Sequence, residues 1–121
     1  MADLRVDSSE LTIVLSRTEK TLALRRQPLV IRHDQIAAAM LTSDPWIWIR
    51  GIRAPGTHVP LSLAFGTWKH HDGKDFLLVK GRAGRLAVIL DLEGHEFDRI
   101  IITTTKAVEL IRALRVTPAA D

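Results

Sequence analysis

The stretch LSLAFGTWKHHDGKDFLLVKGRAGRLAVILDLEGHEFDRIIIT, residues 61–103, decides the fold class of this chain. Its apolar runs are each of strand length, and each junction between them carries Gly beside Asp, Glu, Arg or His. Such junctions are typical of tight turns between antiparallel strands. We therefore expect four consecutive antiparallel strands in this stretch.

The segment LTIVLSRTEKTLALR, residues 11–25, predicts a β-hairpin ahead of these strands. LTIVLS alternates large apolar residues with others at period 2, the polar RTEK follows as a turn, and Leu22 and Leu24 resume the alternation. Pro28 then marks a break. The run LVI, residues 29–31, is either a third strand or a continuation of the hairpin's second strand.

The middle of the chain is less regular. In IAAAML, residues 36–41, three alanines and the cap-like Asp34 favour a helix, but the run before Pro45 is short for one, so helix and strand both stay open. Residues 43–60 contain three prolines and two glycines, which predicts a long connection with one irregular turn around residues 46–49. Connections of this length often carry function.

The C-terminal TTTKAVELIRALR, residues 103–115, predicts one amphipathic helix. Threonines precede it as cap candidates, and arginines lie in its last turn, where cations suit the helix dipole. The apolar face consists of Ala107, Leu110, Ile111 and Leu114. We expect residues 1–9 and 117–121 to be flexible ends and residues 10–116 to form a single domain.

Composition limits the classes of function. Of the 121 residues, 46% are apolar and 26% are charged, which is typical of a folded domain. The chain has no cysteine, which excludes a disulfide, a thiol nucleophile, a zinc knuckle and an iron–sulfur cluster. The net charge of +3 is small and its signs are interleaved. Without a recognition helix or interleaved basic and aromatic residues, nucleic acid is not an expected partner.

The N-terminus MADLRVDSSE is polar and acidic, and it lacks the basic start and apolar run of a signal peptide. No apolar stretch approaches the ~20 residues that a membrane span requires. We therefore expect a cytoplasmic protein, with association to a membrane surface as the alternative.

Five histidines raise the question of a metal site. His70 and His71 are adjacent, so on a strand their side chains point to opposite faces, and Asp72-Gly73 beside them is a favoured pair for a hairpin turn. The His-Glu pair in LEGHE lacks the second histidine of a zinc-protease motif. We expect turns at both places and no metal site.

No motif predicts an enzyme. No serine lies in a Gly-x-Ser-x-Gly elbow, and the carboxylate pairs in DLEG and HEFD flank turns, where acidic residues are common. KGRAGR, residues 80–85, has two glycines and three cations, but it leads into a strand, whereas phosphate-binding loops lead into a helix. We expect no catalytic residue and no cofactor.

The order of about seven or eight strands, a long central connection and one C-terminal helix resembles small bacterial members of the pleckstrin homology-like superfamily. The likeness is carried by the stretch from Pro45 through Gly51, the Pro55-Gly56 pair, FGTW, DFLLV, RLAVILDLEG and FDRIIIT. The resemblance implies a mainly β orthogonal barrel of about seven antiparallel strands in two bent sheets, with the helix closing one end. It also implies that residues 36–41 form a strand.

PWIWIRGIR, residues 45–53, is the candidate contact segment. It sets Trp46 and Trp48 beside Arg50 and Arg53, and Trp and Arg are enriched at the energetic centres of protein interfaces. We predict that these four residues bind a partner. The alternative is that one or both indoles fill an open end of the barrel.

These observations predict a non-catalytic binding or scaffolding module whose partner is another protein or a second copy of itself. One alternative is peripheral binding to anionic membrane lipids through Arg50, Arg53 and the cations of SRTEKTLALRR. Those cations are Arg17, Lys20, Arg25 and Arg26. Lipid-binding relatives carry spaced cations in that region, although this chain lacks their spacing. A small enzyme with an unrecognised site is the second alternative.

Overall fold

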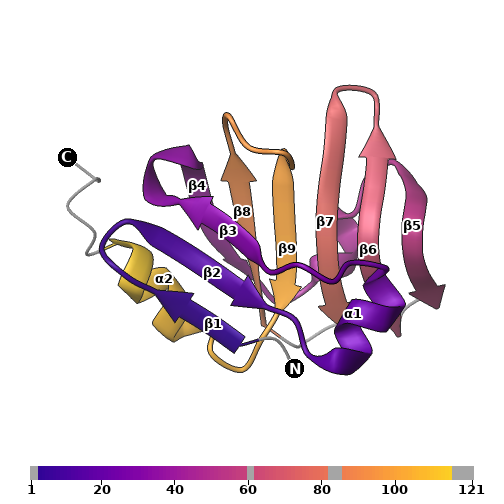
Figure 1. Cartoon of the computed structure of the whole chain (residues 1–121), viewed down its shortest axis with the longest axis horizontal. Coiled ribbons are helices and arrows are strands. Elements are labelled where there is room, and N and C mark those ends of the chain that lie inside the picture. The colour runs from indigo at the N-terminus through magenta and orange to yellow at the C-terminus, as the bar shows by residue number, and fades with distance from the viewer. Residues whose placement is uncertain (1–2, 60–61, 82–85, 116–121) are drawn as a thin grey trace.

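The computed structural model of this protein describes residues 3–59, 62–81 and 86–115 (Figure 1). In these ranges the chain forms nine β-strands in two sheets, two α-helices and two short 3-10 helices. A small sheet crosses one face of a larger sheet, and helices α1 (Arg17–Ala23) and α2 (Ala107–Arg115) lie at the margins of the small sheet (Figure 1). The strand-dominated architecture confirms the predicted mainly β class, and α2 confirms the predicted C-terminal helix.

The small sheet has the antiparallel order β1 (Asp3–Val6), β2 (Glu10–Val14) and β3 (Leu29–Arg32). Strand β3 is therefore a separate strand. Strand β1 lies within residues 1–9, for which we expected a flexible end. The carboxylate of Asp7 accepts hydrogen bonds from two backbone N–H groups of the following turn, at 2.8 Å each, and so turns β1 back along β2. The flexible end expected at residues 117–121 lies outside the described residues.

The large sheet has the order β4-β8-β9-β7-β6-β5. Its strands are β4 (Ile36–Thr42), β5 (Ile52–Val59), β6 (Leu63–His70), β7 (Gly73–Lys80), β8 (Ala87–Leu92) and β9 (Arg99–Thr103). The prediction of four strands in the stretch 61–103 is confirmed, but the prediction that consecutive strands pair antiparallel is wrong at one point. Strand β9 lies between β8 and β7 and runs parallel to β7.

The composition of β9 explains its central position. Its residues Ile100, Ile101 and Ile102 are all buried, so the strand is covered on both faces of the sheet. A continuous apolar run of this kind is typical of a strand with neighbours on both sides and cover on both faces. Periodicity identifies such a segment as a strand but does not reveal which strands flank it.

The predicted hairpin over residues 11–25 is wrong in its second half, because RTEKTLA forms helix α1. The side chain of Ser16 accepts a hydrogen bond from the N–H of Glu19 at 3.2 Å, and the Glu19 carboxylate accepts one from the N–H of Ser16 at 2.8 Å. This reciprocal capping box satisfies two N–H groups at the start of the helix. The Ser-x-x-Glu spacing was visible in the sequence, and it outweighs the weak alternation through Leu22 and Leu24.

The middle of the chain contains two strands. Residues 36–41 lie in β4, as the resemblance implied. The predicted irregular turn is present as the 3-10 helix η2 (Pro45–Trp48), but the long connection expected over residues 43–60 is shorter than predicted because β5 occupies much of it. Strand β5 is at the edge of the sheet and pairs only with β6, with a register shift between Arg53 and Gly56. An edge strand tolerates the intervening proline, which cannot donate to a neighbour.

Two apolar clusters cover the two faces of the large sheet. The first lies between the large sheet, the small sheet and the two helices, and it includes Leu11, Phe76 and Leu110. The second lies on the opposite face, where η2 and the residues around it pack against Trp68, Leu77 and other side chains. Among the described residues neither sheet closes on itself, so the predicted pleckstrin homology-like barrel is not confirmed.

Candidate functional site

The candidate site is built on residues 46–53, which we call the tryptophan segment; it runs from η2 into the start of β5. Pro45 occupies the first turn of η2, where the missing N–H of proline costs nothing. Gly51 has φ +86° and lies so close to the backbone carbonyl of Lys69 that a side chain would collide with it. The segment is therefore pressed against β6 in a conformation that favours glycine.

Both tryptophans of the segment are half-buried and packed against the second apolar cluster. The indole N–H of Trp46 donates to the carbonyl oxygen of Gly81 at 2.8 Å, and that of Trp48 donates to the hydroxyl of Thr42 at 3.2 Å. The rings therefore cover a sheet face, with their polar edges satisfied by groups of the protein itself. Neither sheet closes into a barrel among the described residues, so no indole there fills the end of one.

Arg50 ties the tryptophan segment to the sheet. Its guanidinium donates to the Asp75 carboxylate through Nε at 2.8 Å and Nη2 at 3.2 Å. The carboxylate of Asp75 is only 1% exposed. The hydrogen bonds to Asp75 raise the pKa of the Arg50 guanidinium above its ordinary value, although desolvation acts in the opposite direction. Bidentate pairing of this kind fixes geometry as well as charge.

His70 completes the environment of Asp75. Its Nε2 lies 3.0 Å from Oδ1 of Asp75, and its Nδ1 accepts the backbone N–H of Asp72 at 3.3 Å. Since Nδ1 accepts, we assign the proton to Nε2, which donates to Asp75. The hairpin turn at residues 70–73 is confirmed, and of its two histidines His71 is exposed whereas His70 is largely covered.

A second ion pair lies on the same face. Arg99 donates through Nε to Oδ1 of Asp91 at 2.7 Å, and its guanidinium lies 5.7 Å from the ring centre of Trp48. Asp91 and Arg99 are directly opposed in the β8–β9 ladder. No sequence pattern places Asp75, Asp91 or Arg99 in the site, because their contacts depend on strand order and on where Arg50 lies against the sheet.

The charged cluster formed by Arg50, Asp75, His70, Asp91 and Arg99 has a structural role. A histidine acts as a general base when a nucleophile and a free ring nitrogen lie together. In His70 both nitrogens are used by the hairpin, and Asp75 is held by Arg50. Within residues 3–59, 62–81 and 86–115, no group of three or more potential metal ligands could hold an ion. We infer that this cluster holds the tryptophan segment against the large sheet.

Two of the segment's three isoleucines, Ile47 and Ile52, are exposed, and no sequence pattern indicated this. Ile52 is 78% exposed and Ile47 is 74% exposed, and they are the two most exposed large apolar residues in the described part of the chain. Arg53 is also exposed. The exposed side chains of the segment, besides the partly engaged Arg50, are therefore Ile47, Ile52 and Arg53. In the β5–β6 ladder Ile52 pairs with Lys69 and Arg53 with Trp68, so Arg53 lies on the face that η2 covers and Ile52 points to the opposite face at the edge of the sheet.

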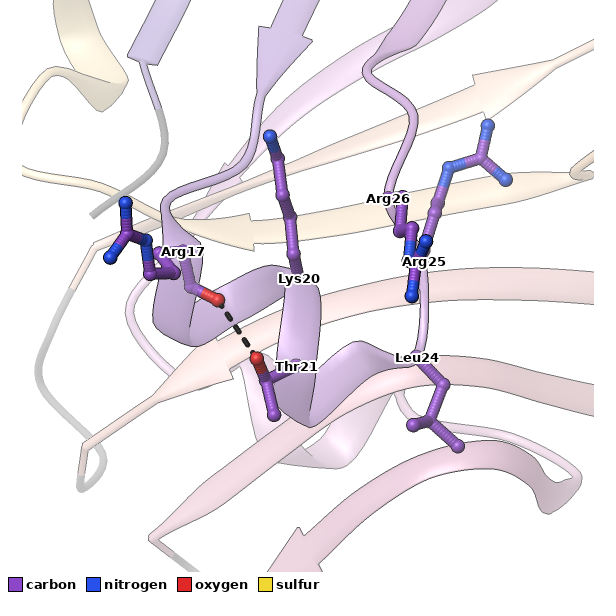
Figure 2. Close-up of a pocket in the computed structure, with 6 residues that line it drawn as sticks. All are labelled: Arg17, Lys20, Thr21, Leu24, Arg25 and Arg26. Atoms are coloured by element: carbon purple, nitrogen blue, oxygen red, sulfur yellow. Dashed lines mark hydrogen bonds between the residues drawn. The ribbon is translucent and has the colours of Figure 1, made fainter.

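The four other predicted cations gather on and after α1. Arg17, Lys20, Arg25 and Arg26 line a hollow of about 560 Å³ together with Thr21 and Leu24 (Figure 2). Arg50 and Arg53 are not among its lining residues. The six cations that the lipid-binding alternative assigned to one surface therefore lie in two separate places in the fold.

No family model, curated protein or solved structure matches this chain. None of the described helices is long and apolar enough to cross a membrane.

Proposed function

We propose that this protein is a non-catalytic binding module whose partner is another protein, contacted through the exposed side of the tryptophan segment. The observation that carries the proposal is the exposure of Ile47 and Ile52, at 74% and 78%. Leaving an isoleucine in water forgoes about 1.5–3 kcal/mol of burial free energy. The two most exposed large apolar side chains of the described residues thus lie five positions apart in one segment.

Rigidity of the segment supports this proposal. Arg50 is held by Asp75, Trp46 by Gly81, and Gly51 is packed against the backbone of β6. A surface that is already ordered loses little conformational entropy on binding, so more of the contact free energy appears as affinity. The tryptophans and Arg50 are thus proposed to support the contact surface. Ile47 and Arg53 are proposed to make its part on the η2 face, and Ile52 its part at the edge of the sheet.

Charge near the segment favours an acidic partner. Ile52 is opposed in the β5–β6 ladder by Lys69, which is exposed, and the next residue, Arg53, is exposed on the opposite face of β5. Neither cation makes an ion pair with any residue of the described ranges. Cations of this kind steer association with an oppositely charged surface. We therefore propose a partner whose surface offers apolar and acidic side chains.

The mode of contact follows from the irregular β5. Its ladder to β6 shifts register between Arg53 and Gly56, and Pro55 lacks a backbone donor. Bulges and prolines protect an edge strand from pairing with a further strand. We propose contact through side chains at the start of β5, in place of strand addition along its length.

Affinity capture of the tagged protein from the cells that express it, with mass spectrometry, tests the proposal. The Ile47→Ser/Ile52→Ser double variant is compared with Leu24→Ser, whose leucine is 68% exposed on α1. We expect a partner that is retained by the Leu24 variant and lost by the isoleucine variant, with both variants folded by circular dichroism. A partner set unaffected by the isoleucines would overturn the proposal, and light scattering that shows a dimer lost with them would point to a second copy.

A further inference from the structure

A second cavity lies on the face of the large sheet opposite η2. Its walls come from the start of α1 and from β6, β7 and β9, and Figure 1 shows α1 beside the end of the sheet where β7 and β9 finish. We call this cavity of about 310 Å³ the α1–sheet pocket. Its apolar lining is Phe65 and Leu78, and its polar lining is Ser16, Thr18, Glu19, Lys80 and Thr103.

The apolar part of the pocket is a floor made by two strands. Phe65 and Leu78 are directly opposed in the β6–β7 ladder, and both are buried members of the first apolar cluster. Pockets for small molecules measure about 300–1,000 Å³ and combine apolar walls with a few polar groups. The α1–sheet pocket lies at the lower end of this range, so it suits a ligand of about the size of an amino acid.

Glu19 places a buried carboxylate in this pocket. Among the described residues, Glu19 and Asp75 are the two buried acids, and Glu19 is only 7% exposed. Asp75 is paired with Arg50 and His70, whereas Glu19 forms no ion pair within the described ranges. Buried charges are normally paired with a charge of opposite sign. A cation in the pocket would supply the partner that Glu19 lacks.

The local structure of α1 leaves one carboxylate oxygen available. Oε1 of Glu19 accepts the backbone N–H of Ser16 at 2.8 Å, but Oε2 accepts no hydrogen bond from a described residue. The neighbouring cations Arg17 and Lys20 line the separate 560 Å³ hollow. The capping box already uses the N–H groups of Ser16 and Glu19, so α1 offers the pocket side chains instead of free backbone donors.

Lys80 brings the opposite charge to the same pocket. Its side chain is exposed at the end of β7, and it forms no ion pair with any described residue, Glu19 included. The Thr103 hydroxyl accepts the backbone N–H of Lys80 at 3.2 Å, which leaves its O–H group able to donate. The pocket therefore holds a negative acceptor apart from a group of donors that carries positive charge.

We infer that the α1–sheet pocket binds a free α-amino acid with an apolar side chain. The ammonium group of the ligand pairs with Glu19, and its carboxylate pairs with Lys80 and the Thr103 hydroxyl. Its side chain lies on Phe65 and Leu78. A simple anion would meet the buried Glu19 carboxylate, and a simple amine would leave Lys80 without a partner. A ligand with both charges satisfies both groups.

Titration calorimetry on the full chain tests the inference, with L-leucine as the probe. Three analogues each lack one feature: 4-methylpentanoate has no amino group, 3-methylbutylamine has no carboxylate, and glycine has no apolar side chain. We expect leucine to bind and each analogue to bind at least about tenfold more weakly. The reason is that each analogue loses either a charged hydrogen bond or the burial of an apolar side chain.

Matched variants assign the binding to the pocket. Glu19→Gln removes the charge but keeps an acceptor for the N–H of Ser16, because glutamine also serves in a capping box. It should weaken leucine binding at least about tenfold, whereas Glu109→Gln, at an exposed position on α2, should not. Lys80→Gln should weaken binding severalfold, and Lys106→Gln, which also removes an exposed ammonium, should have no effect.

A comparison of two ligands separates a binding role of Glu19 from a structural one. Glu19→Gln should weaken leucine binding but should not weaken binding of 4-methylpentanoate, which has no ammonium group to pair with the carboxylate. A variant whose pocket had collapsed would lose both ligands equally. Circular dichroism confirms that each variant is folded, and the analogue series on the wild-type chain needs no variant.

Three results would overturn the inference. They are no binding of leucine at millimolar concentration, binding of 4-methylpentanoate as tight as that of leucine, and equal weakening of leucine binding by Glu19→Gln and Glu109→Gln. The inference does not depend on the proposed protein contact, because η2 packs on the second apolar cluster, across the large sheet from the pocket. Ile47→Ser/Ile52→Ser should therefore bind leucine as the wild type does, so the failure of one proposal is distinguishable from the failure of the other.

Discussion

The guanidinium of Arg50 donates two hydrogen bonds to the carboxylate of Asp75, at 2.8 Å and 3.2 Å, and thereby links the tryptophan segment to the centre of the large sheet. Asp75 is 1% exposed and has His70 as its other partner. The pair thus links a segment that the sequence marked as irregular to a strand that it marked as core.

Removing Arg50 tests this link. Arg50→Ala leaves a buried carboxylate with only His70 as a partner, which should lower the free energy of unfolding by about 2–3 kcal/mol. Urea denaturation followed by tryptophan fluorescence measures the change. The matched control is Arg53→Ala, which removes an exposed guanidinium from the same segment and should change stability by no more than about 0.5 kcal/mol. Equal effects of the two changes would show that the Asp75 pair does not hold the segment.

Gly51 tests the close approach of the segment to β6. Gly51→Ala would place a Cβ against the carbonyl of Lys69 at φ +86°, so we expect a loss of at least about 2 kcal/mol of stability. Gly94 is a matched control, because it also has positive φ, +72°, but no atom lies within 4 Å of its added Cβ. Gly94→Ala should cost only the backbone strain, about 1 kcal/mol. A smaller loss at Gly51 than at Gly94 would contradict the described packing.

Ser16 tests whether residues 17–23 form a capped helix. Ser16→Ala removes the side-chain acceptor for the N–H of Glu19 and should cost about 1 kcal/mol. Thr18→Ala changes a residue in the first turn that makes no hydrogen bond through its side chain in the described ranges, and should be close to neutral. Thermal unfolding of the two variants gives the comparison. If Thr18→Ala proved the more damaging, the segment would not be the capped helix described.

Asp7 gives a pH dependence with a defined sign. Hydrogen bonds from the backbone N–H groups of Ser9 and Glu10 hold the pKa of the Asp7 carboxyl below its ordinary value. Its contribution to stability is therefore fully present above the unfolded-state pKa of about 4 and is lost as the pH falls through the lower folded-state pKa. Between about pH 5 and pH 2, Asp7→Asn should lose less stability than the wild type. Parallel losses in urea denaturation across this range would refute the assignment.

Much of the fold was predictable because its strands follow local rules. The alternation in β6, the turn chemistry at Asp72-Gly73 and the spacing of apolar residues in α2 each reflect the geometry of one element. The insertion of β9 between β7 and β8 could not be predicted in this way. It depends on contacts between segments far apart in sequence, and a continuous run such as RIIIT fits several positions in a sheet.

The two misassigned segments show where local signals compete. In RTEKTLA the capping spacing of Ser16 and Glu19 favoured a helix while the weak alternation favoured a strand, and the satisfied N–H groups decide the outcome. In β5 the proline and glycine that indicated a loop are accommodated by the register shift of an edge strand. Neither outcome follows from residue propensity alone.

The sequence suggested the tryptophan segment as the candidate site, but it did not predict the contacts that the segment makes. The sequence indicated the tryptophan segment because Trp and Arg residues cluster there, and these residue types are enriched at the energetic centres of interfaces. It did not reveal that Arg50 meets Asp75 or that the indoles face the sheet, because both depend on how η2 folds back over β7 and β9. The exposure of Ile47 and Ile52 could not be predicted, because it depends on tertiary packing.

Site-specific photocrosslinking tests the central claim most directly. A photoreactive residue replaces Ile47 or Ile52 in the tagged protein, and in the control it replaces Val108, which is an exposed apolar residue on α2. The account predicts that one protein crosslinks strongly in cells from positions 47 and 52 and weakly or not at all from position 108. Equal crosslinking from all three positions, or none from the isoleucine positions while the partner is still captured, would contradict it.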